Sequence, residues 1–325
     1  MQLALAGRAL TSAAIAWEIY SRQPFTIFAA TYIASNFFGQ LFEPSSQAFV
    51  SDITTGRVRV EGFGLVRMGI NGGWALGLGL ASVVTRAYAP AFAITAGVFT
   101  FSFLLFTFAL REPAHTSSGR MTAGDLRGII HNRPFRLLCF SSLLIGVVAS
   151  QLVPSTSIYV TTHALLPEGW VPRIIAVNGL LVVLLQLPAS RWMGRVGLRR
   201  ALILGSLCYA VGYGSFAYGS QVWHFALCIA IVTVGEVLVM PGAIALASEL
   251  APDTQRGRYL GVYGLAMMVG WSFGPALGGV LLDARPGRSG VPWFPIAALA
   301  LLAAVGYASL KKPKTAAAPS LTFPA

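Results

Sequence analysis

Charged residues are scarce in this sequence, and acidic residues are the scarcest. Of its 325 residues only 10% are charged, with 11 Asp and Glu against 23 Lys and Arg. Soluble globular proteins carry about 25% charged residues. Because 55% of the residues are hydrophobic, a soluble chain of this length could not hide its apolar surface, and the composition predicts a protein whose solvent is lipid. The net charge of +12 then indicates basic loops at a membrane surface and no nucleic-acid partner.

Metal-binding and redox patterns are lacking as well. The three cysteines, Cys139, Cys208 and Cys228, lie in apolar runs without CxxC spacing, and the four histidines are scattered. We therefore expect buried thiols, no disulfide and no metal site. The sequence contains no GxxxxGK[ST] loop for phosphate and no paired-carboxylate or nucleophile constellation. It predicts neither a cofactor nor an enzyme.

Long apolar segments make up most of the chain. A membrane-spanning helix needs about 20 such residues, whereas the strands of an outer-membrane barrel are alternating segments of about ten. Dividing the sequence at charged residues and at Pro and Gly clusters gives ten predicted spans. They are 1–20, 25–49, 62–85, 90–110, 136–160, 172–192, 200–219, 222–249, 258–282 and 291–310.

Basic residues are distributed unevenly between the two sides of these spans. With a cytoplasmic N-terminus, 16 Lys and Arg fall in cytoplasmic segments and 5 in outer segments. This asymmetry predicts a multi-pass protein with both termini in the cytoplasm. The longest cytoplasmic segment, 111–135, is polar and predicts a linker between a partial N-terminal bundle at 1–110 and a C-terminal bundle at 136–310. A cytoplasmic tail follows at 311–325.

The chain contains an internal repeat. Residues 41–81 align without gaps to 238–278, at a constant offset of 197 residues, with 10 identities in 41 positions. A biased membrane composition would give roughly three or four by chance. The identities include Pro44 with Pro241, Arg59 with Arg256 and Trp74 with Trp271. Both copies would cross the membrane in the same direction, so the repeat is parallel, as in the two halves of major facilitator transporters.

Three stretches carry a resemblance that covers essentially the whole chain. They read GEVLVMPGAIALASELAPDTQRGRYLGVYGLAMMVGWSFGPALGGVL at 235–281, FEPSSQAFVSDITTGRVRVEGFGLVRMGINGGWALGLGLAS at 42–82, and RWMGRVGLRR at 191–200. In these stretches the chain resembles the twelve-helix drug:proton antiporter branch of the major facilitator superfamily. The third stretch departs from the usual G-x-x-x-D-R-x-G-R-K loop signature, with Ser190 for the first Gly and Gly194 for the Asp.

The resemblance implies an all-α fold of two parallel-repeat helical bundles in the bacterial inner membrane. The repeat would occupy helices four and five of each half, but its first copy lies in the second and third spans. We therefore expect about ten transmembrane helices, with the first two helices of the fold absent upstream of Met1. The resemblance also places the antiporter motif of helix eleven, where glycines at spacing four allow helices to approach closely, at Gly270, Gly274, Pro275, Gly278 and Gly279. Its helix-five counterpart lies at Asn71, Gly73 and Gly77.

Ionisable residues inside the spans are candidates for proton or substrate binding, because charge is costly in a membrane and usually faces a cavity or a partner. The candidates are Glu236, Glu43 and Arg67. Glu236 lies near the middle of its span and could carry a proton or bind a cationic substrate; a helix-packing carboxyl is the alternative. For Glu43 and Arg67, near the cytoplasmic ends of adjacent spans, we favour a structural ion pair.

Charged residues also gather in the cytoplasmic loops. The resemblance implies an interdomain charge network that stabilises the outward-facing state, whereas topogenic charge explains the same pattern without such a network. The residues concerned are Asp52, Arg59, Arg195, Arg199, Arg200, Glu249, Arg256 and Arg258.

These patterns favour a secondary active transporter that exports a small amphipathic or hydrophobic compound, coupled to protons and working by alternating access. The expected partners are the small-molecule substrate, protons and the lipid bilayer, and we expect a monomer. A truncated fragment without activity of its own is a second hypothesis. A passive channel is a third.

Overall fold

The computed structural model of the chain describes residues 1–83, 88–109, 128–284 and 290–310. The regular secondary structure of these residues is helical, which confirms the predicted all-α fold. The long helices are α1 (Gln2–Tyr20), α2 (Phe25–Ile53), α3 (Gly56–Val83), α4 (Tyr88–Ala109), α6 (Arg133–Ala149), α8 (Val171–Val196), α9 (Leu198–Phe216), α10 (Val222–Leu250), α11 (Arg256–Asp283) and α12 (Trp293–Ala308). The predicted tail at 311–325 and most of the predicted linker at 111–135 lie outside the described residues.

Each predicted span overlaps one of these helices, and the span predicted at 136–160 extends beyond α6 into further helical turns. Five helical segments are long and apolar enough to cross a bilayer by length and composition: Tyr88–Phe108, Arg133–His163, Glu168–Val196, Val222–Leu250 and Arg256–Asp283. The segment Arg133–His163 is not a uniform α-helix. After α6 it continues as a 3-10 turn, the short helix α7 (Pro154–Ile158) and a π-helical turn (Tyr159–His163). Pro154 has no N–H to donate, which explains the change of helix type.

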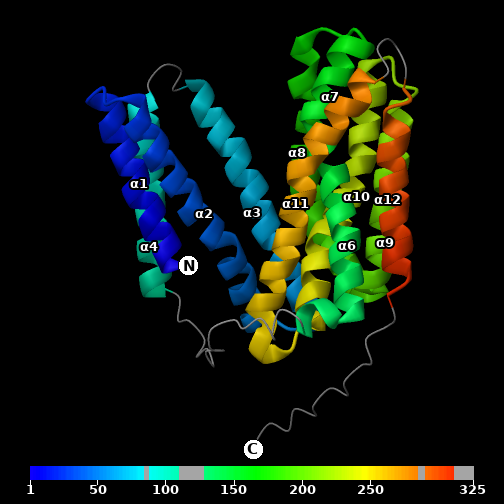
Figure 1. The fold of residues 1–325 in the computed structure, drawn as a ribbon, viewed down its shortest axis with the longest axis horizontal. Helices are drawn as coiled ribbons and strands as arrows, with labels where there is room; N and C mark the ends of the chain where they lie inside the picture. Colours follow the sequence, from blue (N-terminus) through cyan, green and yellow to red (C-terminus); the bar gives the residue numbers. More distant parts are fainter. Residues whose placement is uncertain (84–87, 110–127, 285–289, 311–325) are drawn as a thin grey trace, which may run out of the picture.

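The helices form two groups (Figure 1). In the first group α1 packs against α2 and α4; in the second, α9 packs against α10 and α12, and α6 against α11 and α12. We count α3 with the first group, because it follows α2 in the chain, and it links the groups since it packs against α8 and α10 of the second group. The connections at 54–55 and 251–255 lie at the same end of the molecule, at the bottom of Figure 1. We call this end the basal end.

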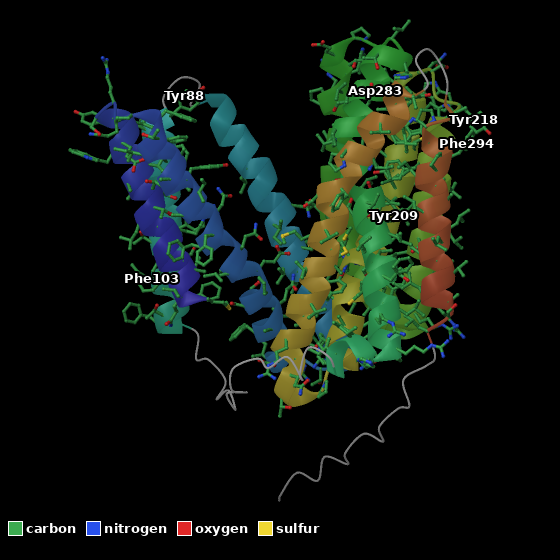
Figure 2. All side chains as sticks on the ribbon, in the orientation of Figure 1. Tyr88, Phe103, Tyr209, Tyr218, Asp283 and Phe294 are labelled. Atoms are coloured by element: carbon green, nitrogen blue, oxygen red, sulfur yellow. The ribbon has the colours of Figure 1, made fainter. Side chains whose placement is uncertain are left out.

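Large apolar side chains lie on both the inside and the outside of the second group. Inside, Trp293 stacks on Tyr213, with ring centroids 5.6 Å apart, and packs against Phe216 at 4.5 Å. Outside, Val305 is 62% exposed and Phe294 is 45% exposed. Figure 2 shows Phe294 projecting from the outer surface while Tyr209 lies within the bundle. Apolar residues on the outer surface suit a helix bundle surrounded by lipid.

The sequence repeat corresponds to a symmetry of the structure. Ser51 of α2 and Ser248 of α10 are separated by the repeat offset of 197 residues, and their buried hydroxyls contact each other. A residue that touches its own repeat copy lies on the axis that relates the copies. The axis therefore passes between α2 and α10 near the basal end.

Candidate functional site

An ion pair inside the molecule joins the two groups of helices. Arg67 of α3 donates from Nη2 to Oε1 of Glu236 on α10. The two side chains are only 22% and 11% exposed. Glu236 Oε2 accepts from the side-chain amide of Asn178 on α8, and this amide also donates to Thr233 Oγ1 at 2.9 Å. The carboxylate of Glu236 is thus held from two helices, one of them in the other group.

The predicted ion pair between Glu43 and Arg67 is wrong. Glu43 instead accepts a hydrogen bond from Gln47, 3.1 Å away on its own helix. The reason is the course of α3, which packs against α8 and α10 much more than against α2. Its arginine therefore meets a carboxylate of the second group.

Glu43 and Arg67 nevertheless line the same cavity, which has a volume of about 550 Å³. Its walls come from α2, α3, α10 and α11, so it lies between the two groups of helices. The polar lining includes a carboxylate, a guanidinium, two amides and a phenol, from Glu43, Arg67, Gln40, Gln47 and Tyr263. The remaining lining is largely apolar and includes Met240, Met267, Met268 and Trp271. A mainly apolar cavity with a few polar groups is typical of a small-molecule site.

The basal end carries charged contacts that obey the repeat. Arg256 Nη1 of α11 donates to Asp52 Oδ1 of α2 at 3.1 Å. In the other repeat copy, the position equivalent to Arg256 is Arg59 and the position equivalent to Asp52 is Glu249. The charge of Arg59 acts on the Glu249 carboxylate. Arg59 also donates to the Thr54 carbonyl at 2.8 Å. These charges, predicted for two loops, thus form one ion pair and one longer-range charge interaction, which the repeat relates to each other.

The other predicted loop residues lie nearby at the same end. Arg195 is near the end of α8, and Arg199 and Arg200 are in the first turn of α9. Arg199 donates to the Ala308 carbonyl at the end of α12. Arg258 is half-buried in the first turn of α11.

Three glycines of the helix-eleven motif form a contact face toward α6 and the turn that follows it: Gly270, Gly274 and Gly278. A Cβ on Gly270 would meet the Leu143 carbonyl, and one on Gly278 would meet Gln151. On Gly274 it would lie 2.7 Å from the Val147 carbonyl, and the Gly274 carbonyl itself accepts from Gln151 at 2.8 Å. Pro275 lies within α11 without ending it, and Gly279 has open space around it.

The helix-five counterpart has different surroundings. Asn71 donates to the Arg67 carbonyl at 2.9 Å, within its own helix. Apart from the nearby backbone of α3 itself, no atom of the described residues lies within 4 Å of a Cβ built on Gly73 or Gly77. The two copies of the motif therefore resemble each other in sequence but not in packing.

Sequence reasoning missed Asn178 and Thr233, which complete the environment of Glu236. Two signals were available. Thr233 precedes Glu236 by three residues and therefore shares its helix face. Asn178 is an isolated polar side chain in the apolar segment that became α8, and such residues in a membrane helix usually bond to another helix.

This helical fold, with its repeat axis and its cavity between two groups of helices, defines a transporter-type membrane protein. The family model "Major Facilitator Superfamily" matches residues 1–172 and 166–324. The chain belongs to this superfamily and is a multi-pass membrane protein.

Similar proteins include several bacterial transporters. The chain is 25% identical to the Bacillus subtilis protein "Uncharacterized MFS-type transporter YhjO", over 86% of this chain and 69% of that relative. It is 27% identical to "Multidrug resistance protein 2" of the same organism, over 79% of this chain and 67% of the relative. It is 23% identical to a "Na(+), Li(+), K(+)/H(+) antiporter" of Planococcus maritimus, over 73% and 63%. Two further relatives are matched over only 40% and 57% of their length.

Solved structures share the fold. The human organic anion transporter MFSD10 has a TM-score of 0.76 at 18% identity, covering 94% of this chain and 76% of that chain. The Major Facilitator Superfamily transporter FucP in the outward conformation has a TM-score of 0.75 at 14% identity, covering 96% of this chain and 82% of that one. At these identities the likeness supports the fold alone.

Proposed function

We propose that the chain is a secondary active transporter of a small amphipathic compound, coupled to protons through Glu236 and working by alternating access. Its expected partners are this substrate, protons and the lipid of a bacterial inner membrane, and its expected state is a monomer. The observation that carries the proposal is the Arg67–Glu236 ion pair between the two groups of helices.

The repeat distinguishes this ion pair from the contacts at the basal end. The Asp52–Arg256 ion pair has a repeat-related counterpart in Arg59 and Glu249, whose charges attract each other. The residues equivalent to Arg67 and Glu236 are Gly264 and Gly39, so the inner pair has no counterpart in the other copy. The repeat-related charges at the basal end already hold the two similar halves together, so the inner pair is not needed for that purpose. An additional, unique charge pair within the membrane-spanning part suits a functional role.

The geometry connects proton binding to movement of the halves. Protonation of the Glu236 carboxylate removes its negative charge and with it the attraction to Arg67. Within the described part of the chain, its two oxygens accept hydrogen bonds from Arg67 and Asn178, so a proton on Oε1 would displace the guanidinium. Arg67 lines the cavity between the halves, where it could then face the substrate. Proton and substrate would thus compete for neighbouring groups, as exchange transport requires.

The lining of that cavity supports an amphipathic substrate with a positive charge. Arg67 is neutralised by Glu236, which leaves Glu43 with an amide donor and no cationic partner in the described part of the chain. Methionines adapt to irregular apolar surfaces, and the indole of Trp271 offers a face for a cation. The names of two relatives mention multidrug resistance and cation/proton exchange, which agrees with this proposal.

The proposal is tested by flux measurements with the full chain in proteoliposomes, using tetraphenylphosphonium as the probe. We expect an imposed pH gradient to accelerate uptake. Glu236→Gln should remove this acceleration, while Glu61→Gln, which alters a half-buried carboxylate 3.9 Å from Arg191, should retain it. An unchanged response in Glu236→Gln would exclude Glu236 from the coupling. If flux through the unaltered chain does not respond to the pH gradient, the result would favour a passive channel.

A further inference from the structure

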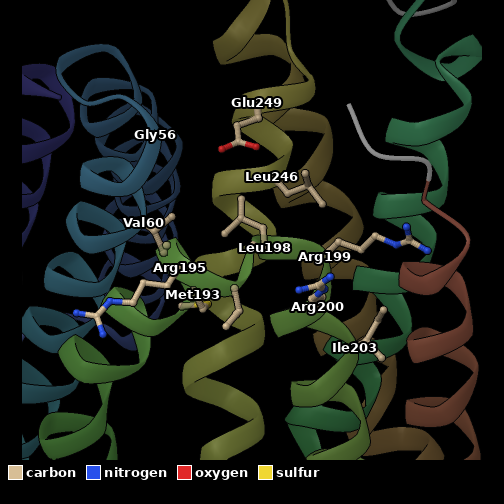
Figure 3. Close-up of a pocket in the computed structure, with 13 residues that line it drawn as sticks. Gly56, Val60, Met193, Arg195, Leu198, Arg199, Arg200, Ile203, Leu246 and Glu249 are labelled. Carbon is tan, nitrogen blue, oxygen red and sulfur yellow. The ribbon is translucent and has the colours of Figure 1, made fainter. Parts of the chain in front are cut away.

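A second cavity, of about 710 Å³, lies at the basal end (Figure 3). It is separate from the cavity between the halves, since the two share no lining residue. Its walls come from the start of α3, the end of α8, the start of α9 and the end of α10. It is therefore built by both groups of helices.

The cavity is rich in positive charge. Arg195, Arg199 and Arg200 line it, and Glu249 is the only acidic residue in its lining. Figure 3 shows Arg195 on the side of α3, and Arg199 and Arg200 on the opposite side. Glu249 also interacts electrostatically with Arg59, and one carboxylate does not balance the charges of three arginines.

In the described part of the chain, no acidic side chain pairs with these arginines. Arg195 and Arg200 are exposed and form no ion pair within the described ranges 1–83, 88–109, 128–284 and 290–310. Arg199 donates to the Ala308 carbonyl, a neutral acceptor that leaves its charge uncompensated. The first turns of α3 and α9 also contain no acidic residue, so their amide dipoles add to the positive potential.

The inner part of the cavity is apolar. Val60, Met193, Leu198 and Leu246 line it and are buried. A charged rim over an apolar floor, at the ends of helices that cross a membrane, suits an amphiphile with an anionic headgroup. Basic pockets between transmembrane helices on the cytoplasmic side are known to bind such headgroups.

We propose that this cavity binds the phosphate group of an anionic phospholipid headgroup, held by Arg195 and Arg200. The loop signature that this segment resembles carries Asp where the chain has Gly194, which also lines the cavity. The lipid phosphate supplies the negative charge that the chain itself lacks there. A headgroup in this position contacts α3 of one half and α8 and α9 of the other, and so stabilises contact between the halves at the basal end.

The proposal is tested by lipid titration of the full chain in neutral detergent, followed by native mass spectrometry and thermal unfolding. Phosphatidylglycerol should bind and raise Tm, and phosphatidylcholine should not. Each arginine near a membrane surface contributes about fivefold in affinity for an anionic lipid. Arg195→Gln and Arg200→Gln should therefore each weaken phosphatidylglycerol binding by about fivefold. Gly194→Asp, which introduces a carboxylate, should weaken it by a similar factor.

Arg191→Gln is the matched control. Arg191 lies on α8 one turn before Arg195 but does not line the cavity, so the variant loses the same charge outside the proposed site. It should change the affinity by less than about twofold, the effect of general surface charge alone. Equal binding of the two lipids, or equal effects of the Arg191 and Arg200 variants, would overturn the proposal. Inorganic phosphate is titrated separately, and stabilisation by phosphate without any preference for phosphatidylglycerol would overturn the assignment to lipid.

Discussion

The environment of Glu236 shows how one carboxylate can be satisfied and still remain responsive. Its two oxygens accept from Arg67 and from Asn178, on two different helices. Loss of the arginine leaves a largely buried carboxylate with an amide donor only. Leaving one charge of such a pair without its partner costs more than removing both charges.

A double-mutant cycle measures this dependence. We expect Arg67→Gln and Glu236→Gln each to lower the unfolding temperature of the full chain in detergent. The double variant should be more stable than the sum of the two losses predicts, with a coupling energy on the order of 0.5–3 kcal/mol. Asn178→Ala provides the comparison for a neutral donor to the same carboxylate. Additive losses in the two charge variants would show that the pair contributes no interaction of its own.

At the level of helices, the packing of α6 on α11 depends on the absence of side chains. A Cβ on Gly146 of α6 would lie 2.9 Å from the Met267 carbonyl and 3.2 Å from the Cα of Gly270. The neighbouring atoms belong to backbone, which cannot move aside without separating the helices. Close backbone approach of this kind drives association of helices in lipid.

The glycine contact can be tested with two alanine variants in one helix. Gly274→Ala should destabilise the chain by about 1–3 kcal/mol, because the added methyl overpacks against α6. Gly279→Ala adds the same methyl where no neighbouring element lies within 4 Å. It should be neutral or slightly stabilising, because Ala has a higher helix propensity than Gly. Thermal unfolding of both variants in the same detergent compares them directly. Equal losses would contradict a specific contact through Gly274.

The helices could be predicted from the sequence, but the pairing of their side chains could not. Continuous apolar segments set the positions of the helices, since each must satisfy its own backbone in lipid. The 197-residue repeat predicted which loops are equivalent. Nothing in the sequence placed α3 against α8 and α10, and so Arg67 was assigned to Glu43, a residue of the preceding helix. Asn178 was missed for the same reason, because its partner is distant in sequence.

At the scale of the whole molecule, the contact of Ser51 with Ser248 marks where the halves meet. Transport by alternating access would require this contact to open and close. Replacing both serines with cysteine, in a chain whose three natural cysteines are changed to serine, should allow a disulfide. We expect oxidation to stop flux of the cationic probe and reduction to restore it.

A protease site inserted within 111–127 reports the cross-link, because oxidised halves stay together on a non-reducing gel after cleavage. A chain with cysteines at positions 46 and 248 is the matched control, since Ser46 bonds within its own helix and lies more than one turn from Ser51. Cross-linking of the 51–248 pair without loss of flux would argue against movement at the axis.

The sidedness of the molecule is open to a direct test. The 16 to 5 distribution of basic residues predicts that the basal end faces the cytoplasm. A single cysteine at Thr55, at the basal end, should react with a membrane-impermeant maleimide only after the cells are opened. One at Ser220, in the connection between α9 and α10 at the opposite end, should react in intact cells. The reverse pattern would contradict the predicted orientation.

The on-axis contact at Ser51 and Ser248 has a consequence for what two joined copies can do. In a symmetric pair of separate, identical chains, every residue on one subunit appears again on the other. An arginine added to one surface would be added to both, and the opposite charge would also appear twice. Joining the copies in one polypeptide removes this constraint. The halves can then keep equivalent residues at the basal end, where they contact each other, and differ at the inner ion pair. Arg67 and Glu236, whose repeat copies are Gly264 and Gly39, form a one-sided pair that two identical separate chains could not form.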